Sequence, residues 1–281
     1  MTKERHVFEA LGRARIVVED GEVVEVSEPR IRYCRLWEKQ RGIPELTEER
    51  IRENIAFRIQ DFGLSTKDRV VELDTFVGFG ASETFMTALR RHLLDSTVTV
   101  CEGAGTVITS NPSLVQGIGA RLSGVIETCP VTGIIQKIEA HEGVVLDPPR
   151  IDQVAGLQSA LEAGYSRVGA TVADLATAVR CRALSSSAVL FGVHLTGITR
   201  DAAEVLCETV DLITACASQH IRELAQDKAL VQAGTAIPIF ALTTRGKEVL
   251  LERAKEIDSP LLVNTMQLPV LPEEKQPRPL I

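Results

Sequence analysis

The chain contains few aromatic residues, no long apolar run and no block of basic residues. Phe, Trp and Tyr make up 4% of the 281 residues, so aliphatic side chains must build most of the core. A membrane-spanning helix needs about 20 consecutive apolar residues, and no such run occurs. The formal net charge is −7. These features argue against a membrane protein and against nucleic acid as the main partner.

Common metal and nucleotide motifs are also missing. The sequence has no Cys-x-x-Cys pair, no His-Glu-x-x-His and no P-loop with its Lys-Ser/Thr. The first five residues, MTKER, lack the apolar stretch of a secretory signal, so we expect a cytoplasmic protein. In that reducing compartment the six cysteines are expected to be thiols, metal ligands or nucleophiles rather than disulfides.

A regular alternation of strand-like and helix-like segments begins near residue 97. Short β-rich runs lie at 97–101, 124–128, 143–146, 167–172, 188–195, 211–216 and 237–241. Helical patterns separate most of these runs, the clearest over 152–163, 200–208, 219–230 and 244–257. Strands that alternate with helices are typical of βαβ units. The pattern predicts an α/β fold of three layers, Rossmann-like, with a mostly parallel sheet covered by helices on both faces.

The two ends of the chain depart from this alternation. Apolar runs on either side of Asp20-Gly21 predict an N-terminal β-hairpin over residues 14–26. Thr47 is expected to begin a helix and Gly63 to end it. The last residues are rich in proline and predict an extended tail, either docked or loose. The predicted division is an N-terminal hairpin and extended segment packed on the core (1–45), an α/β domain (46–258) and a tail (259–281).

Three cysteines fall where predicted strands end. They are Cys101, Cys129 and Cys216. Ligands of parallel sheets bind beyond the carboxyl ends of the strands, so these thiols are expected along one edge of the sheet. Cys181 and Cys207 lie inside helical segments and are predicted to act as small buried hydrophobes. The same role is the alternative for the strand-end thiols, because cysteine is among the most buried residue types.

The glycine loop after Cys101 is the best local candidate for a binding site. Gly103 and Gly105 permit unusual backbone angles, and the N–H groups from Gly103 to Thr106 could form an anion-binding nest. Cys216 precedes a helix whose N-terminal dipole would lower the pKa of its thiol.

Weaker candidates lie elsewhere along the chain. His194, near the end of its own predicted strand, is a candidate base. Residues 77–85 (VGFGASETF) open a helix as phosphate loops do, with Ser82 as a cofactor contact, and N-capping by Ser82 is the alternative. Gly117, Gly119 and Gly124 favour close packing, and Arg121 is the cation nearest the glycine loops in sequence.

Several long blocks of the sequence are similar to those of a known family. They are YCRLWEKQRGI, ENIAFRIQDFG, VCEGAGTVITSNPSLVQGIGARLSG and the segment from ITACASQH to ERAKEI. On these blocks, from about His6 to Ile257, the chain resembles the methanogenesis marker protein 8 family. The resemblance implies a cytoplasmic archaeal protein linked to methane metabolism, without a defined reaction. It places the motif cysteines at Cys34, Cys101 and Cys216, with Cys129 at most an accessory.

Three hypotheses for function follow. In the first, Cys34, Cys101 and Cys216 hold an iron–sulfur cluster for sulfur or redox chemistry, although long separations in sequence are weak support. In the second, Cys101 is the nucleophile or sulfur carrier of a metal-free thiol enzyme, with Cys216 as resolving thiol or His194 as base. In the third, the protein is a non-enzymatic accessory or assembly factor for methyl-coenzyme M reductase or its cofactors. The expected partner is therefore a small molecule or a methanogenesis protein, and the oligomeric state stays open.

Overall fold

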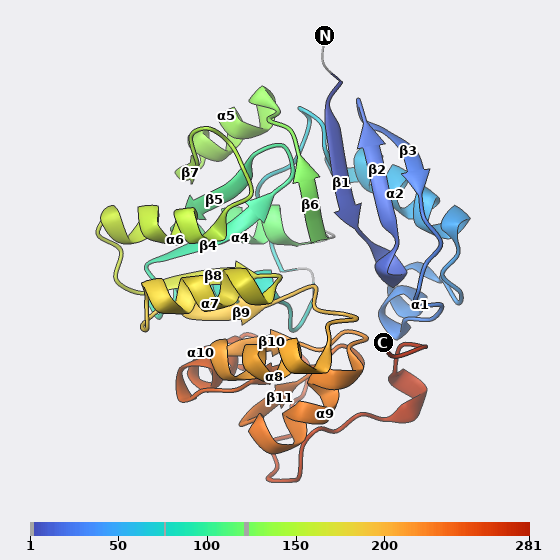
Figure 1. Ribbon diagram of the computed structural model, residues 1–281, viewed down its shortest axis with the longest axis vertical. Coiled ribbons are helices and arrows are strands. Elements are labelled where there is room, and N and C mark those ends of the chain that lie inside the picture. Colours follow the sequence, from blue (N-terminus) through green and yellow to red (C-terminus); the bar gives the residue numbers. More distant parts are fainter. Residues whose placement is uncertain (1–2, 76, 121–123) are drawn as a thin grey trace.

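The protein has an α/β fold with two β-sheets (Figure 1). The structure is a computed structural model that describes residues 3–75, 77–120 and 124–281. The larger sheet has the strand order β11-β12-β10-β9-β8-β4-β5-β7, and the smaller has the order β3-β2-β1-β6. Within the described residues, no helix has both the length and the apolar character that crossing a membrane requires.

The larger sheet is mixed, with a parallel centre and antiparallel edges. Its parallel strands are β4 (Ser96–Cys101), β8 (Val168–Val172), β9 (Val189–Gly192) and β10 (Leu212–Thr214). The antiparallel additions are β5 (Gly105–Thr109) and β7 (Gly143–Val145) beside β4, and β12 (Ile239–Ala241) and β11 (Val231–Ala233) beside β10. The expectation of a mostly parallel sheet is therefore wrong at both edges. The edge strands are antiparallel because short turns, such as the one between β4 and β5, reverse the chain without a crossover helix.

Helices cover both faces of this sheet. One layer contains α6 (Gln153–Glu162), α7 (Leu175–Leu184), α8 (Arg200–Thr209) and α9 (Gln219–Lys228). The opposite layer contains α3 (Ala81–Arg90), α4 (Pro112–Gly119) and α10 (Thr244–Ala254). In the first layer α6 packs on β4 and β8, and successive helices touch one another; in the second, α3 lies between α4 and α10. The three-layer arrangement positions the ends of the parallel strands between the two helix layers.

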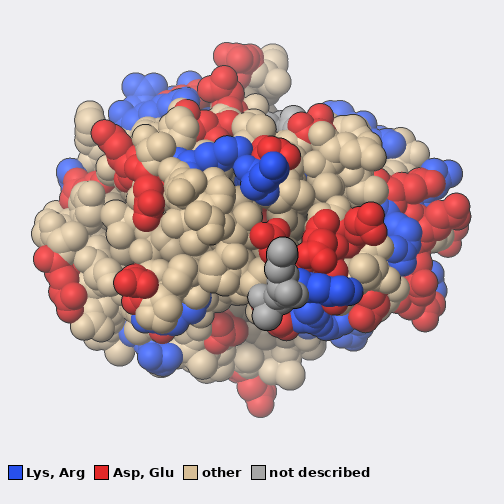
Figure 2. All heavy atoms as spheres, turned by 90° about the horizontal axis from the view of Figure 1, so that it is seen from above, with Lys and Arg blue, Asp and Glu red and all other residues tan. Residues whose placement is uncertain are grey.

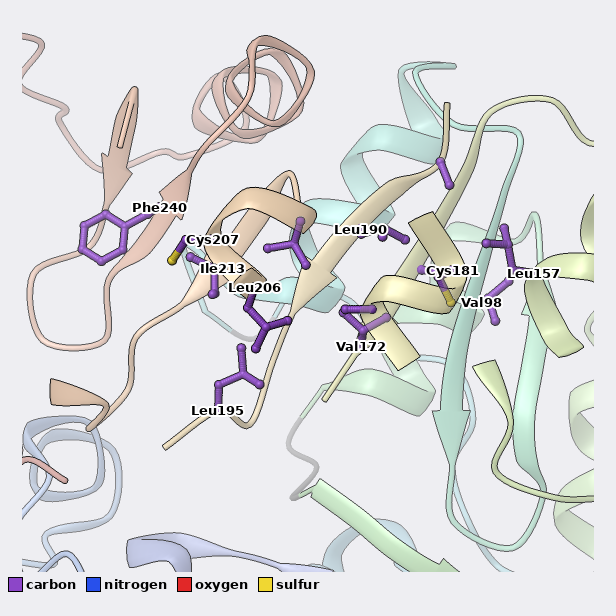
Figure 3. Packing of buried hydrophobic residues seen from close by; sticks show 14 of the residues in the cluster. Val98, Leu157, Val172, Cys181, Leu190, Leu195, Leu206, Cys207, Ile213 and Phe240 are labelled. Carbon is purple, nitrogen blue, oxygen red and sulfur yellow. The ribbon is translucent and has the colours of Figure 1, made fainter. Parts of the chain in front are cut away.

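The core on the first face is aliphatic, as the scarcity of aromatic residues requires. Figure 3 shows Leu157, Leu190 and Leu206 packed there together with Cys181 and Cys207. Both cysteines are buried, so their prediction as small hydrophobes in helices is confirmed. Burial raises the pKa of each thiol to about 11, which makes both poor nucleophiles at neutral pH.

The smaller sheet joins the start of the chain to its middle. It consists of β1 (Arg5–Glu9), β2 (Arg15–Glu19), β3 (Glu22–Val26) and β6 (Gly124–Thr128), all paired antiparallel. The predicted hairpin is β2–β3, with Asp20 and Gly21 both at positive φ. The run at 124–128 is a strand as expected, but it pairs with β1 and not with the parallel strands.

The predicted domain division stays a prediction, and two contacts cross it. Helix α2 (Glu48–Phe62) packs on β3, and β6 belongs to the same sheet as the N-terminal strands. The side chain of Thr47 accepts a hydrogen bond from the N–H of Arg50, and Gly63 ends α2 in the left-handed region, as predicted. Two further helices complete the fold (Figure 1). Helix α1 (Arg35–Arg41) lies beside the smaller sheet, and α5 (Thr132–Ala140) packs on β7.

The end of the tail is docked. Tyr33 and Arg278 form an antiparallel bridge, and the N–H of Ile281 donates to the carbonyl of Ala217. Figure 1 accordingly shows the C-terminus beside α1. Earlier in the tail, Leu262 and Val263 are 88% and 91% exposed. The docked alternative therefore holds for the end of the tail.

Candidate functional site

A cavity of about 110 Å³ lies at the carboxyl ends of the parallel strands. Thr99 near the end of β4, Thr171 near the end of β8, and His194 just after β9 contribute to its wall. Ser82 of α3 and Gln153 of α6 approach from the two helix layers. Open α/β sheets place ligands at this edge, so the cavity lies where the sheet rule predicts a site.

His194 occupies this cavity in an uncommon backbone conformation. Its φ of +56° lies in the left-handed region, which non-glycine residues seldom adopt and which recurs at functional positions. The imidazole lies against Gly124, where an added Cβ would be 3.1 Å from Cγ of the ring. The side chain remains accessible to solvent, but the dense protein around it lowers its pKa by desolvation. The ring is therefore neutral at pH 7 and has one nitrogen able to accept a proton.

Ser82 lines the cavity but does not cap its helix. The N-cap residue of α3 is Gly80, and no side chain caps it. The carboxylate of Glu83 instead accepts hydrogen bonds from the N–H of Val77 (3.1 Å) and from Oγ of Ser82 (3.1 Å). A Cβ at Gly80 would lie 2.2 Å from Oε2 of Glu83, so glycine leaves room for this carboxylate. A negative charge at the helix N-terminus disfavours the phosphate contact expected from the sequence.

The cavity contains polar residues that the sequence pattern did not single out. Oγ1 of Thr171 donates to Oγ1 of Thr99 at 3.3 Å, and Gln153 adds an amide. The sequence signal that could have indicated these residues is a threonine near the end of each of two strands that lie side by side in the parallel part of the sheet. Gly117 does allow close packing, because a Cβ there would be 1.9 Å from the carbonyl oxygen of Val71. Arg121 lies outside the described residues.

Cys101 is sealed in a separate apolar cluster. It is fully buried and packs with aliphatic residues that include Val71, Ile118 and Ile134. Burial and the neighbouring Glu102 carboxylate raise the pKa of its thiol well above the ordinary value. The loop that follows is the turn of the β4–β5 hairpin, in which Cys101 pairs with Gly105. Thiolate chemistry at Cys101 is therefore strongly disfavoured in this conformation.

The polar groups of the glycine loop form hydrogen bonds within the protein. Gly103 and Gly105 have φ of +76° and +78°, the left-handed region that the turn requires. The N–H of Gly103 donates to Oγ1 of Thr128 at 2.7 Å, and the N–H of Thr106 donates to the carbonyl of Arg150 at 2.8 Å. The hydroxyl oxygen of Thr106 accepts from the backbone N–H of Asp152 at 2.8 Å. The N–H groups of Gly103 and Thr106 therefore already have protein acceptors, and the anion nest stays a prediction.

Cys34 and Cys216 lie close enough to interact electrostatically. Cys34 is the buried N-cap residue of α1, and Cys216 follows β10. Burial, followed by the nearby thiol of Cys34, raises the pKa of Cys216 to about 12. The expected lowering of this pKa by the helix dipole is wrong, because loss of solvent outweighs the dipole. The buried guanidinium of Arg222 lies beside both thiols.

The three family cysteines do not form the donor set of an iron–sulfur cluster. Cys34 and Cys216 are neighbours, whereas Cys101 belongs to a different core cluster. Within residues 3–75, 77–120 and 124–281, no group of three or more His, Cys, Asp or Glu side chains could hold a metal ion. A cluster-binding protein would bring at least a third ligand to the pair. The cluster therefore stays a prediction from sequence, and the described geometry does not fit it.

Cys129 has a histidine neighbour that the sequence did not predict. It follows β6 and is partly exposed. Its Sγ lies 3.9 Å from Nε2 of His6 and accepts a hydrogen bond from the N–H of Arg5 at 3.1 Å. No pattern in the sequence predicts β1 or its pairing with β6, so only the fold brings His6 to this site.

Comparison with known proteins identifies relatives but no reaction. The chain matches the family described as "Uncharacterized protein conserved in archaea (DUF2099)" over residues 6–255. It is 52% identical over 284 residues to an uncharacterized protein of Methanocaldococcus jannaschii, covering 99% of this chain and 100% of that protein. No solved structure matches the chain significantly. The chain therefore belongs to the DUF2099 family of conserved archaeal proteins.

Proposed function

We propose that the protein binds a small polar metabolite in the strand-end cavity and acts on it with His194 as general base. The observation that carries this proposal is the position of His194, which lines the cavity at the carboxyl edge of the parallel strands in a left-handed backbone conformation. A base must accept a proton at the working pH, and lowering the pKa of a histidine keeps its ring ready to do so.

The wall of the cavity favours an uncharged, hydrogen-bonding ligand. Thr99 and Gln153 offer donors and acceptors to the cavity, and the hydroxyl oxygens of Ser82 and Thr171, whose O–H groups donate to Glu83 and Thr99, offer acceptors. Glu83 adds a negative charge behind Ser82 and therefore opposes a phosphate or carboxylate at this point. A volume of about 110 Å³ admits a molecule, or part of one, with only a few heavy atoms.

A small library of neutral polar compounds, such as amides, diols and short sugars, would test the binding step by protein-observed NMR. We expect perturbations to cluster on the cavity residues, and His194→Gln should weaken binding of any hit about tenfold or more. His92→Gln is the matched control, because His92 also has a positive φ (+55°) but is exposed and does not line this cavity. Hits that bind elsewhere, or that bind His194→Gln equally well, would remove the proposal.

Family context supports a role in methane metabolism. The chain resembles the methanogenesis marker protein 8 family, and the relative from Methanocaldococcus jannaschii comes from a methanogen. We expect a methanogen that lacks the protein to form methane more slowly, with rescue by the wild-type gene and not by His194→Gln. Full rescue by His194→Gln would show that the cellular role does not depend on His194 and its cavity.

A further inference from the structure

A nucleophile, a base and an orienting hydroxyl meet at the far end of β6, a site not involved in the proposal for His194. His6 of β1 pairs in register with Thr128 of β6, and Cys129 is the next residue. The imidazole of His6 is buried, whereas the thiol of Cys129 is partly exposed. Figure 1 shows β6 pointing toward the end of the molecule that carries the N-terminus, the end seen in Figure 2.

Thr128 contacts one ring nitrogen of His6, Nδ1, and leaves the other, Nε2, facing the thiol. The hydroxyl oxygen of Thr128 accepts from the N–H of Gly103 at 2.7 Å, and its O–H donates to the carbonyl of Cys129 at 3.5 Å. Nδ1 of His6 lies 2.7 Å from the same oxygen, and because the hydroxyl proton is used toward Cys129 we assign the ring proton to Nδ1. Nε2 of the neutral ring is then the acceptor, and it faces Sγ of Cys129 at 3.9 Å. This is the arrangement of a base that is held in place by a third group.

The surroundings of the pair favour a neutral base. Burial lowers the pKa of His6, and the Glu102 carboxylate partly opposes this effect. Glu102 is itself paired with Arg69 at 2.5 Å, both side chains being fully buried. The N–H of Arg5 donates a hydrogen bond to Sγ of Cys129 and so helps to hold the sulfur in place. The guanidinium of Arg5 is directed to Glu127 at 2.5 Å.

The surrounding backbone favours a sulfur electrophile over a carbonyl. Acyl transfer needs N–H donors aimed at a developing oxyanion. Three N–H groups near the thiol already have acceptors: those of Arg5, Gly103 and Val131 donate to Sγ of Cys129, Oγ1 of Thr128 and the carbonyl of Gly103, respectively. Attack on a disulfide places the charge on a leaving sulfur instead. On the face in Figure 2, acidic and basic side chains are interspersed, so the described surface attracts neither sign strongly.

We propose that Cys129 and His6 form a nucleophile–base pair that carries out thiol–disulfide exchange with small-molecule disulfides. Nε2 of His6 takes the thiol proton, and Sγ of Cys129 attacks one sulfur of the disulfide RSSR. The S–S bond of the substrate breaks as the bond from Sγ to the attacked sulfur forms. The leaving thiolate takes the proton from His6, so RSSR and the thiol become a mixed disulfide and RSH, without net oxidation.

Reaction of the full-length protein with 2-hydroxyethyl disulfide tests this inference. Peptide mass spectrometry should locate a single mixed disulfide on Cys129, and Cys129→Ser should abolish it. His6→Gln should slow adduct formation at pH 7 about tenfold or more, and Thr128→Val should slow it less. Cys216→Ser is the matched control, because Cys216 is the other partly exposed thiol, and its loss should leave the rate unchanged.

The pH profile of the wild-type protein gives a test that needs no variant. The rate should be close to its plateau at pH 7 and fall as His6 is protonated in more acidic solution. A base gives this behaviour, whereas an ordinary thiol reacts faster with each added pH unit up to about pH 8.5. A profile of the ordinary kind, an adduct on Cys216 in place of Cys129, or a folded His6→Gln protein with the wild-type rate would each overturn the inference.

Discussion

Gly124 of β6 lies directly against the imidazole of His194, which follows β9 of the other sheet. A Cβ added at Gly124 would be 3.1 Å from Cγ and 3.3 Å from Nδ1 of the ring. This contact joins the smaller sheet to the carboxyl edge of the larger one. The orientation of His194 therefore depends on the absence of a side chain at position 124.

Gly124→Val should displace this ring without destabilising the fold. Valine suits a strand better than glycine, so we expect the free energy of unfolding to change by less than about 1 kcal/mol. The displaced ring gains solvent, so the pKa of His194 should rise toward its ordinary value of 6.5. NMR titration of the imidazole checks the pKa, and urea unfolding checks stability. An unchanged titration of His194 would show that the contact does not hold the ring.

Acid should destabilise the protein through its two desolvated histidines. The pKa of His6 and of His194 lies below 6.5 in the folded protein. Between each lowered value and 6.5, the unfolded chain binds more protons than the folded chain, so stability rises with pH across this interval. The free energy of unfolding should therefore decrease as pH falls below about 6.5, and decrease less in His6→Gln. Urea titrations at pH 5.5 and 7.5 measure this, and identical pH dependence in both proteins would contradict it.

Removing one member of the buried ion pair of Arg69 and Glu102 should lower the free energy of unfolding substantially. Nε of Arg69 lies 2.5 Å from Oε1 of Glu102, and Nη2 donates to the carbonyl of Gly117 at 2.9 Å. Arg69→Met leaves a carboxylate without its partner in the interior, so we expect a loss of about 3–5 kcal/mol. Glu102→Gln retains an acceptor for Arg69 and should cost less. Equal losses from both substitutions in urea unfolding would show that packing, not charge, dominates.

The sequence predicts the local elements better than their partners. The apolar runs that became β8 and β9 were recognisable because strands buried on both faces are continuously apolar. β5 was missed because Gly103 and Gly105 indicate a loop equally well as a nest or as a hairpin turn. The pairing of β6 with β1 has no local signal, since the two strands are separated by more than 100 residues.

The candidate sites show the same limit. Ser82 and His194 could be selected because they end or begin elements that a parallel sheet brings to one edge. Cys129 and His6 are 123 positions apart, and only the unpredicted β1–β6 pairing brings them together. The local surroundings of Cys216 were also not predictable from the sequence, because the dipole argument did not include the surrounding protein that raises the pKa of this thiol by desolvation.

Removing the last six residues should expose the pair of Cys34 and Cys216. The backbone of Arg278 bonds to that of Tyr33, next to Cys34, and Ile281 donates to Ala217, next to Cys216. Within the same segment the side chain of Gln276 accepts from the guanidinium of Arg222, which also donates to the carbonyl of Cys216. These contacts hold the tail over both thiol-bearing segments.

Deletion of residues 276–281 should therefore speed alkylation of Cys34 and Cys216 by iodoacetamide at least severalfold, because solvent access lowers the raised pKa of each thiol. Mass spectrometry under native conditions follows both sites, with the buried Cys181 as an internal reference for global unfolding. Val263→Ser is the matched control within the tail, because that side chain is 91% exposed and its loss should leave alkylation unchanged. Faster labelling of Cys181 along with the other two would mean that the deletion loosens the whole fold, and unchanged labelling of all three would mean that other segments protect the pair.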